Sequence, residues 1–176
     1  VAGGPLLAGM ADCQYDMAIS AMTITADRAE QFGFSDPYIN AGQIVAVQAG
    51  NEAVSGPEDL VGTTIGAQIG TTGAMEAEEI ADTTVKVYDT YELAFLDLSN
   101  GQIDAVIADY PTAVAFVNQN SDQLKTVGEV FTDESYGIAF CKGNDELISQ
   151  VNAALDELKA EGYIEELVLE WYGSAE

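Results

Sequence analysis

The single arginine of the chain and a threonine before it can bind a carboxylate. Arg28 is the only arginine in the sequence, and its planar guanidinium grips a carboxylate through two parallel hydrogen bonds that lysine cannot reproduce. Thr23 can direct its hydroxyl and its backbone N–H at the same carboxylate. The alternative is a surface ion pair of Arg28 with Asp27, Glu30 or Asp36, worth less than about 1 kcal/mol. Position alone leaves both interpretations open.

Asp109 and the backbone carbonyl of Ala21 can bind an ammonium group. Asp109 directly follows the apolar run IDAVIA, and α/β sheets place their ligand groups at the carboxyl ends of such strands. The alternative is that Asp109 caps the helix that Pro111 opens. The Ala21 carbonyl can accept from the same amine. Arg28 and Thr23 for a carboxylate, with Asp109 for an amine, match the zwitterionic end of an α-amino acid.

Two further threonine-rich segments have the composition of helix starts. The turn Gly70-Thr-Thr-Gly73 precedes a helical pattern, and the free N–H groups and dipole of a helix N-terminus favour an anion. Such a turn is a weak functional signal when taken alone. Thr25 precedes a short helix with Asp27 in its first turn, so we expect Thr25 to cap that helix and not to contact a ligand.

The composition argues against most catalytic chemistry and against nucleic-acid binding. The chain has no histidine, which removes the usual general base, the Ser-His and Cys-His pairs and the commonest zinc ligand. We therefore expect no enzyme activity, no metal and no cofactor. With 30 acidic and 5 basic residues the formal net charge is -25, so a nucleic-acid backbone or an anionic lipid surface would be repelled.

The cysteines and the lengths of the apolar runs give information on the cellular compartment of the protein. Cys13 and Cys141 are too far apart for a CxxC motif, which leaves one disulfide or two buried thiols. No run approaches the roughly 20 apolar residues of a membrane-spanning helix, and residues 1–10 lack the basic start of a secretory signal. We expect a soluble chain from which any targeting segment has been removed.

Apolar runs alternate with helical patterns along the chain. We expect strands at residues 16–20, 43–48, 63–67, 85–88, 103–108 and 136–141. We expect helices at residues 74–80, 91–98, 111–119, 145–162 and 163–172. This alternation predicts an α/β fold with mostly parallel sheets and helices on both faces.

The strands at 43–48 and 136–141 are expected to cross between two sheets. The first lobe then consists of residues 1–43 and 137–176, and the second lobe, 44–136, is inserted into it. A hinged cleft is the natural result of two such crossings.

Several segments of the sequence resemble one family along the whole chain. They are YDMAISAMTITADRAEQFGFSDPYINAG at 15–42, DLVGTTIGAQIGTTG at 59–73, NGQIDAVIADYPTA at 100–113, YGIAFCKGNDELISQVNAALDELKAEG at 136–162 and WYG at 171–173. The string TIT..R…FS.PY is highly specific. The chain resembles the extracytoplasmic amino-acid-binding proteins of ABC importers, solute-binding family 3, polar amino acid type.

The resemblance implies a two-lobed periplasmic-binding-protein-like fold of type II and a ligand site in the interlobe cleft. It implies ligand-carboxylate contacts from Arg28, Thr23 and Thr72, amine contacts from Asp109 and the Ala21 carbonyl, and pocket lining by Ser20, Gln68 and Gly70. Gln68 in AQIGTTG is similar to members that take arginine or other polar side chains. The closed form would deliver the ligand to the membrane permease of an ABC transporter, from the periplasm or as a cell-surface lipoprotein.

The same resemblance favours a disulfide between Cys13 and Cys141, because the strands that follow and precede them would be antiparallel neighbours. An extracytoplasmic location permits such a bond.

The chain departs from the family at its start. Members begin with a further strand, helix and strand, and residues 1–11 are similar to the tail of that helix. The first lobe is therefore expected to be incomplete, with an exposed sheet edge through which a dimer can form. Two rival functions share the scaffold. One is the ligand-binding sensory domain of a receptor, and the other is a dehydratase-type enzyme.

Overall fold

The computed structural model describes residues 3–173. These residues form two compact units: unit 1 comprises residues 3–41 and 134–173, and unit 2 comprises residues 42–133. The chain therefore enters unit 2 once and leaves it once. The lobe boundaries expected from the sequence, 43/44 and 136/137, lie within three residues of these divisions. A hinged motion of the two units stays a prediction.

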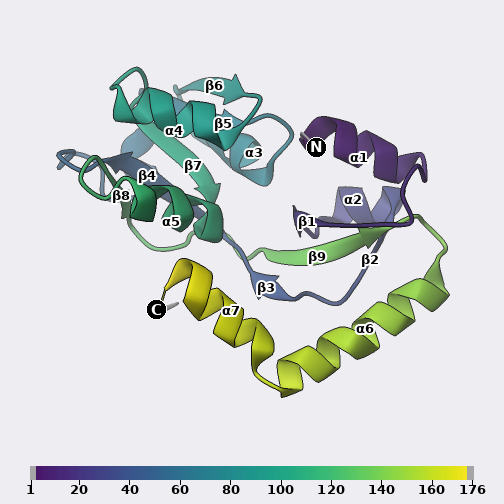
Figure 1. Cartoon of the computed structure of the whole chain (residues 1–176). Coiled ribbons are helices and arrows are strands. Elements are labelled where there is room, and N and C mark those ends of the chain that lie inside the picture. The colour runs from purple at the N-terminus through teal and green to yellow at the C-terminus, as the bar shows by residue number, and fades with distance from the viewer. Residues whose placement is uncertain (1–2, 174–176) are drawn as a thin grey trace. The chain divides into compact units, whose positions relative to one another are not determined.

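Unit 1 is an antiparallel sheet with helices on both sides (Figure 1). Its strands are β1 (Met17–Thr23), β2 (Gly33–Phe34), β3 (Ile39–Asn40) and β9 (Ser135–Phe140). Its helices are α1 (Gly3–Ala11), α2 (Ala26–Gln31), α6 (Asp145–Ala160) and α7 (Tyr163–Tyr172). The strand β9 pairs with each of the other three, and so forms the centre of the sheet.

Side chains alternate across the sheet of unit 1. Ala139 of β9 faces the α1 side, where it packs with Met10 and Met22. Ile138 and Phe140 face the opposite side and pack against α6 and α7. This alternation follows from the two-residue period of a strand, and it makes YGIAF suitable for a strand covered on both faces.

Unit 2 is a five-stranded mixed sheet in the order β6-β5-β7-β4-β8. Its strands are β4 (Gln43–Gln48), β5 (Thr64–Gln68), β6 (Thr84–Tyr88), β7 (Ala105–Asp109) and β8 (Leu124–Val127). Its helices are α3 (Thr72–Glu79), α4 (Tyr91–Ser99), α5 (Tyr110–Gln119) and the 3-10 helix η1 (Pro57–Leu60). The strand β5 runs parallel to β6 and β7, whereas β4 runs antiparallel to β7 and β8.

The central strands of unit 2 are buried on both faces. One face packs residues such as Ile44 and Val106 against α4 and α5. The other packs Val45 and Ile107 against residues that include Leu60 and Ala77 of η1 and α3. Strands covered on both faces become continuous apolar runs, which explains the sequences QIVAVQ and AVIAD.

The α/β fold class is confirmed, but the sheets are mixed and not mostly parallel. The parallel pairs come from the strand-helix-strand units of residues 64–109. The two crossing strands, β4 and β9, are antiparallel to their neighbours. Each follows a segment that comes from the other unit, and not a helix that covers its own sheet. The short strands β2, β3 and β8 were not expected from the sequence.

Cys13 and Cys141 form a disulfide, as the resemblance implied. The antiparallel pairing of β1 with β9, with Met17 opposite Phe140, brings the two cysteines together. The helix expected near the start is present as α1, whose Leu6, Leu7 and Met10 pack on the sheet. Residues 1–2 and 174–176 lie outside the described residues.

Candidate ligand-binding site

Arg28 is anchored to the end of β1 in unit 1. Thr25 is the N-cap of α2, and its hydroxyl oxygen accepts a hydrogen bond from the Arg28 backbone N–H at 3.2 Å. The cap predicted from the sequence is therefore confirmed. One guanidinium nitrogen of Arg28, Nη1, donates to the Thr23 carbonyl at 2.8 Å. Thr23 is 3% exposed, so the guanidinium is held against a buried strand end.

Ser20 and Ala21 lie in an irregular stretch of β1. Between the pairs Ala18–Ala139 and Met22–Gly137, three residues of β1 lie opposite one residue of β9. Ala21 takes a left-handed conformation, with φ 47°, which an L-residue adopts at a cost of about 1 kcal/mol or more. Both Ser20 and Ala21 are exposed. Such bulges turn backbone groups out of the ladder, and this one frees the Ala21 carbonyl from regular pairing.

Tyr38, which directly precedes β3, contacts the bulge at Ala21. Burial raises the pKa of Tyr38, and a hydrogen bond between its hydroxyl and the Ala21 backbone opposes that rise. The phenol therefore stays protonated at neutral pH and links the loop before β3 to the strained residue.

In unit 2 the expected anion-binding turn connects β5 to α3. Gly70 has φ 75°, a conformation that favours glycine. Thr71 is the N-cap of α3: its hydroxyl accepts from the Ala74 N–H at 3.2 Å and donates to the Gln68 carbonyl at 2.7 Å. The side-chain amide of Gln68 donates to the Asp89 carbonyl at 2.9 Å. Gln68 therefore stabilises the turn through its backbone carbonyl and its side-chain amide, in addition to lying next to it.

A buried glutamine joins Thr72 to Asp109, and sequence reasoning missed it. Gln43, the first residue of β4, lies opposite Asp109 of β7 in the strand register. Its amide Nε2 donates to the Thr72 hydroxyl at 3.1 Å and to the Asp109 carboxylate at 2.5 Å. Gln43 is fully buried, and its Oε1 has no hydrogen-bond partner among the described residues. The available signal was a glutamine at the first position of the strand QIVAVQ, directly before its apolar run.

Gly73 makes room for this network. A Cβ at Gly73 would lie 2.7 Å from Gln43 Oε1 and 2.9 Å from both the Tyr91 hydroxyl and the Ile107 carbonyl. Because backbone and buried polar atoms meet there, no other residue type fits without displacing them. The start of α3 is thus packed directly onto the ends of β4 and β7.

Asp109 occupies the N-cap position of α5 without capping it. The helix has no side-chain hydrogen bond at that cap. The alternative that the Asp109 carboxylate caps α5 is therefore wrong. The interaction with Gln43 points it instead along the end of the sheet, beside Thr72. Asp109 and Thr72, which come from distant segments of the sequence, are therefore brought together on one side-chain amide within unit 2.

The predicted residues thus form one group in each unit. Unit 1 holds Ser20, Ala21, Thr23 and Arg28, which lie at the end of β1 and the start of α2. Unit 2 holds Gln68, Gly70, Thr72 and Asp109, which lie at the ends of β5 and β7 and the start of α3. No group of three or more metal-ligating side chains was found among residues 3–173.

A discontinuous first unit, an inserted second unit and polar groups at the strand ends define an α/β protein of the type II periplasmic-binding class. Residues 4–174 match the bacterial extracellular solute-binding proteins, family 3. The chain belongs to that family. In the described part of the chain no helix is both long and apolar enough to cross a membrane.

Known relatives are amino-acid-binding proteins. The chain is 31% identical over 171 residues to the L-cystine-binding protein TcyJ of Escherichia coli (strain K12), covering 96% of this chain and 64% of TcyJ. It is 34% identical over 158 residues to the ABC transporter glutamine-binding protein GlnH of Bacillus subtilis (strain 168), covering 89% of this chain and 57% of GlnH. The chain thus spans about three fifths of the length of these relatives.

Among solved structures, the fold is similar to an ancestral arginine-binding protein bound to arginine. The TM-score is 0.88 at 39% sequence identity, and the match covers 96% of this chain and 76% of the other. At this identity the likeness extends beyond the fold to the family.

Proposed function

We propose that this chain binds a small polar or basic L-amino acid for import by an ABC transporter. The observation that carries the proposal is the Thr72–Gln43–Asp109 network, in which one buried amide binds both a hydroxyl and a carboxylate at the end of the mixed sheet of unit 2. Burying an amide costs free energy unless it is hydrogen-bonded, and strand ends are where α/β proteins place ligand groups.

The proposed contacts follow the chemistry of each group. Arg28 and Thr23 of unit 1, with Thr72 of unit 2, bind the ligand carboxylate. Asp109 and the Ala21 carbonyl bind its ammonium group, while Ser20, Gln68 and Gly70 line the pocket. The anchoring of Arg28 on the Thr23 carbonyl supports this assignment, because it fixes the guanidinium at the end of β1, next to the other proposed contacts of unit 1.

The electrostatic field favours a cationic side chain, with arginine the first candidate. A net charge of -25 raises the local concentration of cations and speeds their encounter with the protein. The arginine-bound structural relative is consistent with this preference.

The proposed setting is outside the cytoplasm, in the periplasm or on the cell surface, with a membrane permease as the partner that receives the ligand. The Cys13–Cys141 disulfide supports an oxidising compartment. We propose binding without catalysis, in keeping with the names of the relatives. A sensory receptor domain is the alternative, and it would bind the same class of ligand.

Calorimetric titration with L-arginine and other polar amino acids tests the site residues. We expect Arg28→Ala and Asp109→Ala each to weaken binding by about 100-fold or more, because each removes a charged partner of a desolvated ligand group. The matched control is Asp122→Ala, which removes an exposed carboxylate and should leave affinity unchanged. Unchanged affinity in either site variant, with the fold intact by circular dichroism, would refute the assignment.

A further inference from the structure

Gln43 lies where the chain enters unit 2 and bonds the segment through which the chain leaves it. We call residues 42–43 the entry segment and residues 131–133 the exit segment of this unit. The Gln43 backbone N–H donates to the Thr132 hydroxyl at 2.8 Å, and the Gln43 carbonyl accepts from the Phe131 N–H at 2.9 Å. The entry and exit segments are therefore held together by both backbone groups of one residue.

Gly42 brings the two segments into direct contact. A Cβ at this position would collide with the Thr132 carbonyl oxygen and with Val130 Cγ1, so only glycine permits the approach. The Gly42 carbonyl accepts from the Tyr110 N–H at 2.8 Å, directly after Asp109 in the sequence. The entry segment thus lies between the exit segment and the residue that carries the proposed amine contact.

The side chain of Gln43 bonds two candidate ligand groups of unit 2. Its Nε2 donates to the Thr72 hydroxyl and to the Asp109 carboxylate, and the residue is fully buried. A buried amide that leaves its partners loses hydrogen bonds that water does not replace there. The bonds to Thr72 and Asp109 therefore restrain the backbone of Gln43, which is the part that bonds the exit segment.

We propose that Gln43 is a positioning residue that couples ligand binding at Thr72 and Asp109 to the pairing of the entry and exit segments. The inference rests on the proposed function, because it places the ligand on these two groups. A bound ligand restrains both groups, so an opening that frees Gln43 must also release the ligand. The free-energy cost of that opening therefore rises with ligand concentration. Coupling is reciprocal, so weaker pairing of the segments weakens ligand binding.

Amide hydrogen exchange, measured by NMR on the ligand-free chain, tests the coupling without any ligand. Asp109→Ala should speed exchange of the Phe131 N–H by about fivefold or more, relative to the Asp104 N–H. That reference amide bonds the Thr64 carbonyl at 2.9 Å in the same sheet. In a Gln43→Leu background Asp109→Ala should add nothing, because the connecting side chain is already gone. No acceleration, or the same acceleration in both backgrounds, would overturn the proposal.

Calorimetric titration with L-arginine tests the reciprocal effect. Thr132 is not among the proposed ligand contacts, but its hydroxyl accepts from the Gln43 N–H. Thr132→Val removes that acceptor at nearly constant volume and should weaken arginine binding by about fivefold or more. Thr132→Ser keeps the hydroxyl and should keep the native affinity. A residue that contributed only packing would give the opposite order, because valine fills the space of threonine better than serine does.

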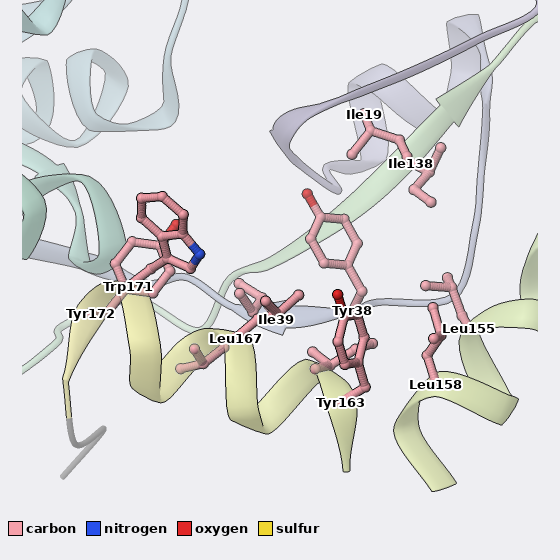
Figure 2. Close-up of a pocket in the computed structure, with 12 residues that line it drawn as sticks. Ile19, Tyr38, Ile39, Ile138, Leu155, Leu158, Tyr163, Leu167, Trp171 and Tyr172 are labelled. Atoms are coloured by element: carbon pink, nitrogen blue, oxygen red, sulfur yellow. The ribbon is translucent and has the colours of Figure 1, made fainter. Parts of the chain in front are cut away.

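Leu167→Ala is the control for a general loss of stability. Figure 2 shows Leu167 on α7, in an apolar pocket of unit 1, and this variant should bind L-arginine like the native chain. Native affinity in Thr132→Val, or equal losses in Thr132→Val and Thr132→Ser, would overturn the proposal. A native chain that binds no amino acid would refute the proposed function, and the exchange experiment on the ligand-free chain would still decide the coupling.

Discussion

Gln43 shows how one buried side chain can organise a candidate ligand site. Its amide donates to Thr72 and Asp109, which come from distant parts of the sequence and which the family resemblance assigns to the two charged ends of an amino acid. The arrangement leaves one acceptor, Oε1, without a partner among the described residues. That uncompensated atom costs stability, while the amide nitrogen of the same side chain fixes the placement of Asp109 and Thr72.

Replacing Gln43 by leucine should lower the free energy of unfolding by about 1–3 kcal/mol, because the Thr72 oxygen and the Asp109 carboxylate lose a buried donor. The matched control is Gln48→Leu at the other end of β4, where the side chain is exposed and the effect should stay below about 0.5 kcal/mol. Urea unfolding of both variants measures the difference. Equal stabilities would mean that the Gln43 contacts contribute nothing net.

At the scale of elements, the ion pair between β6 and α4 gives a measurable pH dependence. Lys86 Nζ lies 2.6 Å from Asp97 Oδ2, and the Tyr88 hydroxyl donates to the same oxygen at 2.8 Å. The hydrogen bond from Lys86, followed by that from Tyr88, lowers the pKa of Asp97. The hydrogen bond to Asp97 is the main cause that raises the pKa of Lys86.

The directions of these two pKa shifts define the pH range over which the pair stabilises the folded protein. The Asp97 contribution is fully present above its ordinary pKa of 3.8 and is lost as the pH falls through the lower folded value. The Lys86 contribution is present below 10.5 and is lost as the pH rises through the higher folded value. Lys86→Met should therefore be slightly less stable than the native chain at neutral pH, with the difference closing at both extremes.

Carboxyl NMR titration gives the sharper test of this pair. The pKa of Asp97 should rise toward its ordinary value in Lys86→Met and stay low in the control Lys125→Met, which alters a lysine of β8. If the Asp97 pKa is the same in all three proteins, the pair does not interact in solution.

The elements that sequence reasoning predicted well are those with strong local patterns. The strand at 43–48 and the helix at 163–172 agree with the structure residue for residue, since a continuous apolar run and a clear helical period each favour one structure. The two-residue strands β2 and β3 exist only because β9 pairs with them. No local pattern marks such strands. The four-residue segment LKTV of β8 is likewise too short to predict its pairing with β4.

The candidate site was predictable to a similar degree. The charged and hydroxyl-bearing residues could be proposed from residue type and position, since a lone arginine and an acid after a strand stand out. The contacts that orient them could not. The Gln43 network depends on strand register and helix packing, and the left-handed Ala21 depends on a bulge against β9, so both require the tertiary structure.

At the scale of the whole molecule, the disulfide links two distant parts of unit 1. Cys13 and Cys141 are separated by 128 residues, and unit 2 lies within the loop that they close. Cross-linking so long a loop restricts the unfolded chain, so replacing both cysteines by serine should lower the free energy of unfolding by about 2–5 kcal/mol. Urea unfolding of the double variant against the native chain measures this. A native chain no more stable than the variant would show that the bond adds no net stability.

Binding of a free amino acid is the central claim, and a thermal-shift screen of the native chain against the common L-amino acids tests it most directly. A ligand that binds only the folded state raises the unfolding temperature, and the rise continues to grow with the logarithm of ligand concentration above the dissociation constant. We expect a concentration-dependent rise with arginine or another polar amino acid, and no rise when Arg28→Ala is screened with the same ligand. No rise with any amino acid, or an equal rise in Arg28→Ala, would contradict the account.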